Sequence, residues 1–191
     1  RQVEKIDVRA NTIQAGLRGI AFEGFSVPAS ATIERNDIDI NFFRYSYVEN
    51  DDFGPEPVGI SLKLFEFANG EYGVVEDNTI RMQTGDTSID PLTIAIAWQS
   101  VEGIEFASDN ILSVGDTLSG GGLAFGLFME EAENILFTEM VFRDSLTDSD
   151  AVISEAATNI SYCCNDIATT GEAFFFSGMS EGTKMNLNNI G

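Results

Sequence analysis

The only two cysteines of the chain, Cys163 and Cys164, are adjacent. Consecutive Cα atoms lie about 3.8 Å apart, which is less than the roughly 4.4–6.8 Å usual for a disulfide. A bond between these two thiols would therefore close a strained ring. Without further cysteines or any histidine the pair cannot complete a structural zinc site. Three states remain open for these residues: packed free thiols, a vicinal disulfide, or crosslinks to other chains.

The chain contains no histidine. Histidine-dependent catalytic triads, histidine-ligated zinc and histidine-ligated haem all need an imidazole as base or ligand, so they are excluded. A pair of carboxylates could still act as in a glycosidase. However, 31 Asp and Glu residues supply so many pairs that none stands out. We therefore expect a protein that is not an enzyme.

Acidic stretches are the remaining candidates for a ligand site. Ca²⁺ takes six to eight oxygen ligands, and the segments 49–52 and 144–150 each gather several carboxylates. Their spacing does not match an EF-hand loop, and acidic loops that are merely solvated explain the same residues. We expect no required cofactor, with Ca²⁺ as the alternative. The candidate calcium ligands are Glu49, Asp51, Asp52, Asp144, Asp148 and Asp150.

The formal net charge of −21 comes from 31 acidic and 10 basic residues. Nucleic acids and anionic membranes are bound through clustered Lys and Arg, so neither is an expected partner. The apolar runs are far shorter than the roughly 20 residues that span a bilayer, and no membrane insertion is expected. A chain that starts with Arg1 fits a mature product whose leader has been removed. We expect an extracellular, cell-surface or virion location.

Alternation of apolar and polar residues dominates the chain. The stretches "DIDINFFRYSYV" (37–48) and "VGISLKLFEFA" (58–68) both alternate with a period of two, which is typical of strands with one buried face. Asn69-Gly70 follows the second stretch and favours a tight hairpin turn. A second hairpin is expected over 129–140. Further strands are expected at 3–8, 18–25, 79–83, 91–98, 123–129, 135–143 and 172–177.

One segment favours a helix. Over 150–160 the apolar residues are spaced as one helical face; they are Val152, Ile153, Ala156, Ala157 and Ile160. No internal repeat is apparent. Short strands separated by Gly, Asp, Asn and Pro, without long helices, favour an all-β fold. We expect one antiparallel β-sandwich or jelly-roll domain spanning 1–191, with a short helix at 150–160.

Both terminal segments alternate like strands. Ile6, Val8 and Ala10 share one face near the N-terminus, as do Met185 and Leu187 near the C-terminus. Such strands either pair within their own sheet or complete the edge of a sheet in another copy. The second case suggests a non-enzymatic structural subunit of an extracellular or virion assembly, a filament, sheath or shell whose partners are its own copies. The alternative is a calcium-dependent adhesion module, or one that binds carbohydrate or protein.

Overall fold

A computed structural model describes residues 5–26, 30–42, 57–65, 73–84, 93–102, 104–108, 110–117, 124–144, 149–178 and 181–191. These residues form twenty strands and no helix. The described part of the chain accordingly holds no helix that is long and apolar enough to cross a membrane.

The strands are arranged in three sheets. Sheet A holds β1 (Lys5–Arg9), β4 (Ser30–Glu34), β7 (Gly73–Glu76), β10 (Ile104–Ser108), β13 (Glu133–Thr138), β16 (Thr158–Cys163) and β19 (Lys184–Asn186). Sheet B holds β2 (Thr12–Ala15), β5 (Asp37–Phe42), β8 (Thr79–Thr84), β11 (Ile111–Thr117), β14 (Val141–Asp144), β17 (Asp166–Ala168) and β20 (Asn189–Ile190). Sheet C holds β3 (Arg18–Ser26), β6 (Val58–Phe65), β9 (Thr93–Val101), β12 (Ala124–Glu130), β15 (Ser149–Glu155) and β18 (Phe174–Ser177).

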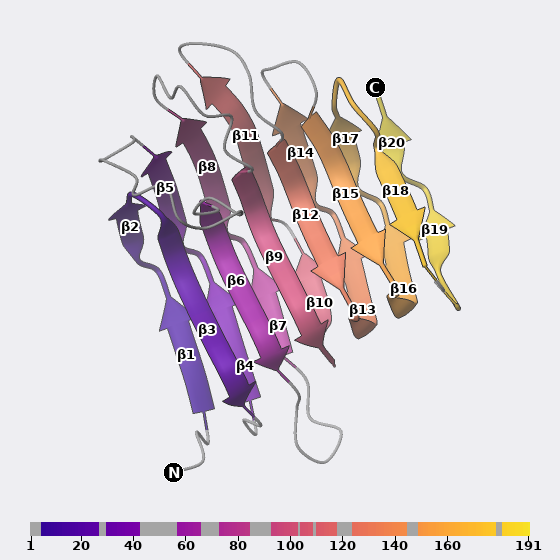
Figure 1. Cartoon of the computed structure of the whole chain (residues 1–191), viewed down its shortest axis with the longest axis horizontal. Helices are drawn as coiled ribbons and strands as arrows, with labels where there is room; N and C mark the ends of the chain where they lie inside the picture. The colour runs from indigo at the N-terminus through magenta and orange to yellow at the C-terminus, as the bar shows by residue number, and fades with distance from the viewer. Residues whose placement is uncertain are drawn as a thin grey trace, which may run out of the picture.

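Each strand pairs with the strand three places along the chain, and every such pair is parallel. The chain therefore visits sheets A, B and C in turn and then rises to the next level, as Figure 1 shows. We call each such circuit a coil: coil 1 is β1–β3, and coil 7 is β19 and β20. This architecture is a parallel β-helix, a solenoid in which each coil contacts its neighbours.

The expected antiparallel sandwich or jelly roll is wrong, because all three sheets are parallel. Parallel strands usually need a long crossover, often a helix. Here the other two strands of each coil supply that crossover. An alternation of period two shows which residues share a face of a strand but not the direction of the neighbouring strand. The sequence pattern therefore fitted either arrangement.

The expected hairpins and helix are also wrong. Strands β6 and β7 flank Asn69-Gly70, which lies outside the described residues, but they belong to sheets C and A. The same is true of β12 and β13, which cover most of 129–140. The segment 150–160 forms β15, a corner at Ala156 with φ 48°, and the start of β16. The corner brings Val152 and Ile160 into one core, which produced the helix-like spacing.

Columns of apolar side chains fill the interior. Ile38, Ile80, Leu112, Phe142 and Ile167 follow one another in register along sheet B. Each is at most 3% exposed. Such burial stabilises a domain by roughly 25 cal/mol per Å² of apolar surface.

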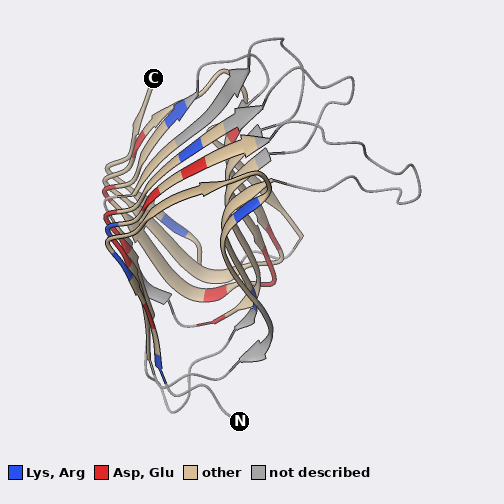
Figure 2. Ribbon diagram, turned by 90° about the vertical axis from the view of Figure 1, so that its left-hand side faces the viewer, with Lys and Arg blue, Asp and Glu red and all other residues tan. Residues whose placement is uncertain are grey.

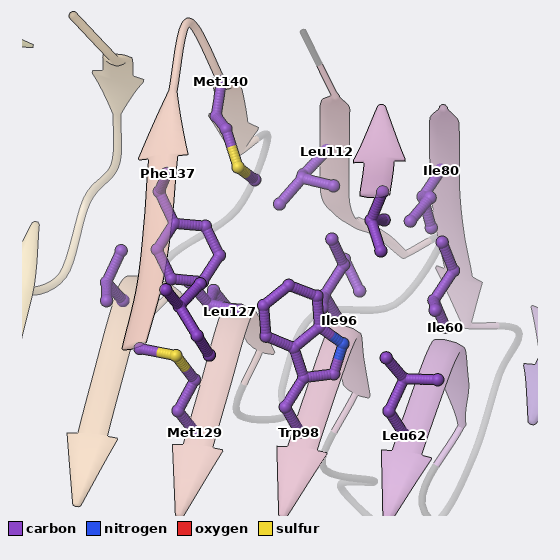
Figure 3. Close-up of a cluster of buried hydrophobic side chains, with 14 of the residues drawn as sticks. Ile60, Leu62, Ile80, Ile96, Trp98, Leu112, Leu127, Met129, Phe137 and Met140 are labelled. Carbon is purple, nitrogen blue, oxygen red and sulfur yellow. The ribbon is translucent and has the colours of Figure 1, made fainter. Parts of the chain in front are cut away.

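Aromatic rings fill the space opposite these columns. The rings of Trp98 and Phe137 stack with centroids 5.3 Å apart, and Phe137 stacks on Tyr162 at the same distance. Figure 3 shows Trp98 and Phe137 among the surrounding aliphatic side chains. Burial raises the pKa of Tyr162 above its ordinary value. These stacks come from strands of sheets A and C, so the core joins the sheets as well as the coils.

Candidate functional site

A two-residue corner leads from sheet A to sheet B in every coil. Its first residue has a positive φ in the six coils where it is described, between 53° and 63°. Those residues are Ala10, Arg35, Asp77, Glu139, Cys164 and Leu187. The second residue is asparagine in six coils and methionine in coil 5: Asn11, Asn36, Asn78, Asn110, Met140, Asn165 and Asn188. Several of the first residues are charged, so charges gather along this corner in the end-on view of Figure 2.

The corner asparagines form a hydrogen-bonded ladder. The backbone N–H and the side-chain amide of Asn36 both donate to Oδ1 of Asn78, at 3.1 and 2.9 Å. Asn78 donates in the same way to Asn110, and Asn11 to Asn36. The amides of the asparagines after Asn11 also donate to a carbonyl of the preceding coil, as from Asn78 to Ile33 at 2.9 Å. The ladder satisfies polar groups that the corner buries.

The ladder has a donor end and an acceptor end. Every rung except Asn110 donates to the side-chain oxygen of the next coil where one follows, so Asn188 is the last acceptor among the described residues and receives the amide of Asn165 at 2.8 Å. Met140 interrupts the series: its N–H still donates to Asn165 at 3.0 Å, but it offers no oxygen to Asn110. The recurring pattern behind the ladder is Asn, any residue, then an apolar residue, as in "NDI", "NTI" and "NNI". The pattern does not stand out in the sequence, because the connections between these triplets differ in length.

The predicted assembly residues lie in the terminal coils. Ile6 is 6% exposed and joins the core, and Val8 packs against that core. Ala10 is the corner residue of coil 1. In coil 7, Met185 is 52% exposed and Leu187 86% exposed. Both terminal segments also pair inside their own sheets, β1 with β4 and β19 with β16.

Cys163 and Cys164 are both free thiols in this structure. Cys163 ends β16 and is half-buried, whereas Cys164 is the exposed corner residue of coil 6, with a φ of 63°. A hydrogen bond with the thiol of Cys163 is the main cause that raises the pKa of the Cys164 thiol above its ordinary value, and burial adds to it. The corner geometry therefore places two interacting thiols at the surface.

This interaction predicts the pH dependence of Cys164 alkylation. The thiolate is the reactive form, so the rate should reach half its maximum at a pH above that of an ordinary thiol. Replacement of Cys163 by alanine removes the partner thiol and should shift that midpoint downward. Peptide-level mass spectrometry after iodoacetamide labelling over a pH series measures the midpoint of the Cys164 alkylation rate in each protein. Identical midpoints in the two proteins would contradict the assignment.

The predicted calcium ligands are only partly described. Glu49, Asp51, Asp52 and Asp148 lie outside the described residues, and Asp144 is placed only as the end of β14. The carboxylate of Asp150 accepts the N–H of Glu172 at 2.6 Å. Among the described residues, no three carboxylates or thiols come together as a metal site. Calcium binding stays a prediction.

Ion pairs join neighbouring coils on the outer face of sheet B. Arg81 contacts the carboxylates of Asp37 at 2.5 Å and Asp39 at 2.8 Å, and these hydrogen bonds raise the pKa of its guanidinium. Arg143 pairs with Asp166, and this contact is the main cause that lowers the pKa of that carboxyl. These pairs reduce charge repulsion between coils of an acidic chain.

Comparison with known proteins assigns neither a family nor a function. No family model matches the chain, no curated protein is detectably similar to it, and no solved structure matches its fold significantly.

Proposed function

We propose that this protein is a non-enzymatic structural subunit that associates head to tail, coil 7 of one copy stacking on coil 1 of the next. The observation that carries the proposal is the polarity of the asparagine ladder, whose two ends are complementary. A contact between two different surfaces propagates as a filament unless it closes as a ring. The copies would still pair through their terminal strands, as expected from the sequence, but at the ends of a solenoid and not at the edge of a sandwich.

The hydrogen bonds of the stacked interface follow from those within the chain. Asn188 is the last rung, and its N–H and amide stand where other rungs donate to the next oxygen. Asn11 is the first rung, and its Oδ1 stands where other rungs accept. In the free chain the Asn11 amide donates to its own Arg9 carbonyl at 3.1 Å. In the stacked pair the Asn11 amide would donate to the carbonyl of Met185 in the neighbouring copy. Met185 is equivalent to Val8, whose carbonyl accepts the amide of Asn36 within the chain.

The side chains of the two terminal coils are also complementary. The registers place Lys184 in the same column as Asp7, and Met185 in the same column as Val8. Stacking therefore brings opposite charges together and covers the exposed Met185 with an apolar neighbour. Ile190 is 55% exposed and belongs to the column of Ile13. Burial of these side chains favours association.

The stacking continues sheets A and B only. Coil 7 contains no sheet C strand within the described residues. In the stacked pair, sheet C would therefore have a gap of one strand between β18 (Phe174–Ser177) of one copy and β3 of the next. An interface of two continuous sheets supplies backbone hydrogen bonds in the manner of strand addition. Most of the interface contacts would therefore come from sheets A and B and from the ladder corner between them.

The sedimentation coefficient of the protein should rise with concentration. Association follows mass action, so about a hundredfold range of concentration should reveal it. Met185→Glu places a carboxylate against Val8 of the next copy and should weaken association at least about tenfold, equivalent to about 1.4 kcal/mol. Met185 is half-exposed in the free chain, so the substitution should change the stability of the fold little.

Leu187→Glu is the matched control, because it introduces the same charge two residues away. Glu139 already occupies the equivalent corner position with the same kind of positive φ, and side chains in that column lie at the surface. This variant should associate like the wild type. A wild-type protein that remains monomeric over the whole range would contradict the proposal, as would a Met185→Glu variant that associates normally.

A further inference from the structure

A groove of about 310 Å³ lies on the outer face of sheet C. Its floor comes from Ser61 and Ala97, which are register partners on β6 and β9. The same outer column carries Ala21 in coil 1 but Phe128, Ile153 and Phe175 in coils 4 to 6. The groove therefore exists because successive coils carry small residues beside coils that carry bulky ones.

The two sides of the groove differ in character. Val58 and Ile94 line it on one side; both are buried although neither belongs to the interior cluster. Lys63, Gln99 and Glu130 form a polar row on the other side, one residue from each of three adjacent strands. The amide of Gln99 donates to Glu130 at 2.6 Å, which leaves the Gln99 oxygen as an acceptor.

Phe128 closes one end of the groove. Its ring stacks with that of Phe125, with centroids 6.1 Å apart and planes inclined by 13°. This contact holds the Phe128 ring in place before any ligand arrives, which reduces the entropy lost on binding. An aromatic ring offers an apolar face to C–H groups. The groove thus combines a floor of small residues, a fixed ring and a row of donors and acceptors.

We propose that this groove binds a neutral, extended oligosaccharide that lies across the strands. A sugar ring presents C–H groups to the Phe128 ring and the Ala97 methyl group, and hydroxyls, which both donate and accept, to the polar row. Neighbouring strands lie about 4.8 Å apart, so a straight chain that lies across β6, β9 and β12 meets one residue of the polar row on each strand. The volume is near the lower limit of the roughly 300–1,000 Å³ usual for ligand pockets, which suits a few sugar units.

Other ligand classes fit this groove less well. A peptide brings backbone N–H and C=O groups that need partners, but β6 and β9 are paired on both sides. They therefore have no free backbone edge for strand addition. The lining holds two cations, Arg18 and Lys63, and one acid, Glu130, but a polyanion would still be repelled by a chain of net charge −21. Arg18 of coil 1 also lines the groove, but the groove lies on sheet C, which the proposed stacking does not continue. Sugar binding therefore does not depend on the proposed assembly.

Isothermal titration calorimetry with cellohexaose tests the inference on the full chain. We expect saturable binding, weaker binding of maltohexaose, whose chain curves, and weaker binding of a hexameric oligogalacturonate, which is charged. Ala97→Phe fills the groove floor from the outer face and should reduce cellohexaose affinity at least about tenfold. Gln99→Leu removes the central polar group at nearly constant volume and should also weaken binding.

Ser161→Phe is the matched control. Ser161 lies between the buried Ile160 and Tyr162 on sheet A, so its side chain is on an outer face remote from the groove, and binding should be unchanged. The inference is overturned if cellohexaose does not bind, or if Ala97→Phe binds it as well as the wild type does. Equal or tighter binding of maltohexaose or the oligogalacturonate would also overturn it. Circular dichroism of each variant confirms that the fold is retained.

Discussion

Replacement of Asn78 by alanine should lower the free energy of unfolding by about 3 kcal/mol. Asn78 is fully buried in the centre of the ladder. The substitution leaves the N–H and amide of Asn36 without their acceptor and the carbonyl of Ile33 without its donor. Each buried polar group left unpaired costs about 1–3 kcal/mol. Urea denaturation followed by circular dichroism measures the change.

Asn11→Ala provides the control within the same ladder. Asn11 is exposed and is the first rung. Its replacement by alanine removes only the side-chain amide from the Asn36 oxygen, which still accepts the backbone N–H of residue 11, and water can replace the lost donor near solvent. We expect a loss below about 1 kcal/mol for this variant. Equal losses for the two variants would show that burial does not govern the strength of the ladder.

Gly59→Ala should destabilise the protein by about 3 kcal/mol, because added volume in a closely packed core forces the backbone apart. A Cβ at this position would lie 2.6 Å from the carbonyl oxygen of Ala95, and it would also overlap Cγ2 of Ile80. Gly59 faces the column of Ile80 where sheets B and C approach each other. Since a backbone oxygen of the adjacent strand cannot move independently, a side-chain rotation does not relieve the overlap. Thermal unfolding of the purified variant measures the loss.

Gly16→Ala is the corresponding control. The nearest atom to a Cβ there is the carbonyl oxygen of Asn41, at 3.9 Å, which is an ordinary contact. Replacement of glycine by alanine at a compatible position stabilises a protein by about 0.4–1 kcal/mol through the unfolded state. We therefore expect an unchanged or slightly raised melting temperature. A loss comparable to that of Gly59→Ala would contradict the assignment of the Gly59→Ala effect to crowding.

Much of the candidate interface was available from the sequence. The alternation around Val8 and Met185 placed both residues on strand faces near the ends of the chain, and this placement holds in the structure. The face of Leu187 was not predictable in this way. Leu187 is a corner residue with a φ of 53°, and a pattern of period two contains no information about where a strand ends in such a corner.

The groove could not be predicted from the sequence. Ser61, Ala97 and Phe128 lie on three separate strands, and only the registers of sheet C make them neighbours. The connections from sheet B to sheet C also differ in length from coil to coil: residues 43–57 separate β5 from β6, whereas two residues separate β2 from β3. A variable connection hides the period of a solenoid, so equivalent positions in successive coils are not equally spaced along the chain.

The sequence by itself determined the all-β class, the strand faces and the absence of histidine chemistry, because side-chain types and their alternation are local properties. Only the tertiary structure decided that the sheets are parallel and that the asparagines stack. The same stacking places Lys184 and Asp7 in one column of sheet A. Strand direction and register depend on which coil packs on which, and that choice is made by the summed burial and hydrogen bonding of whole coils.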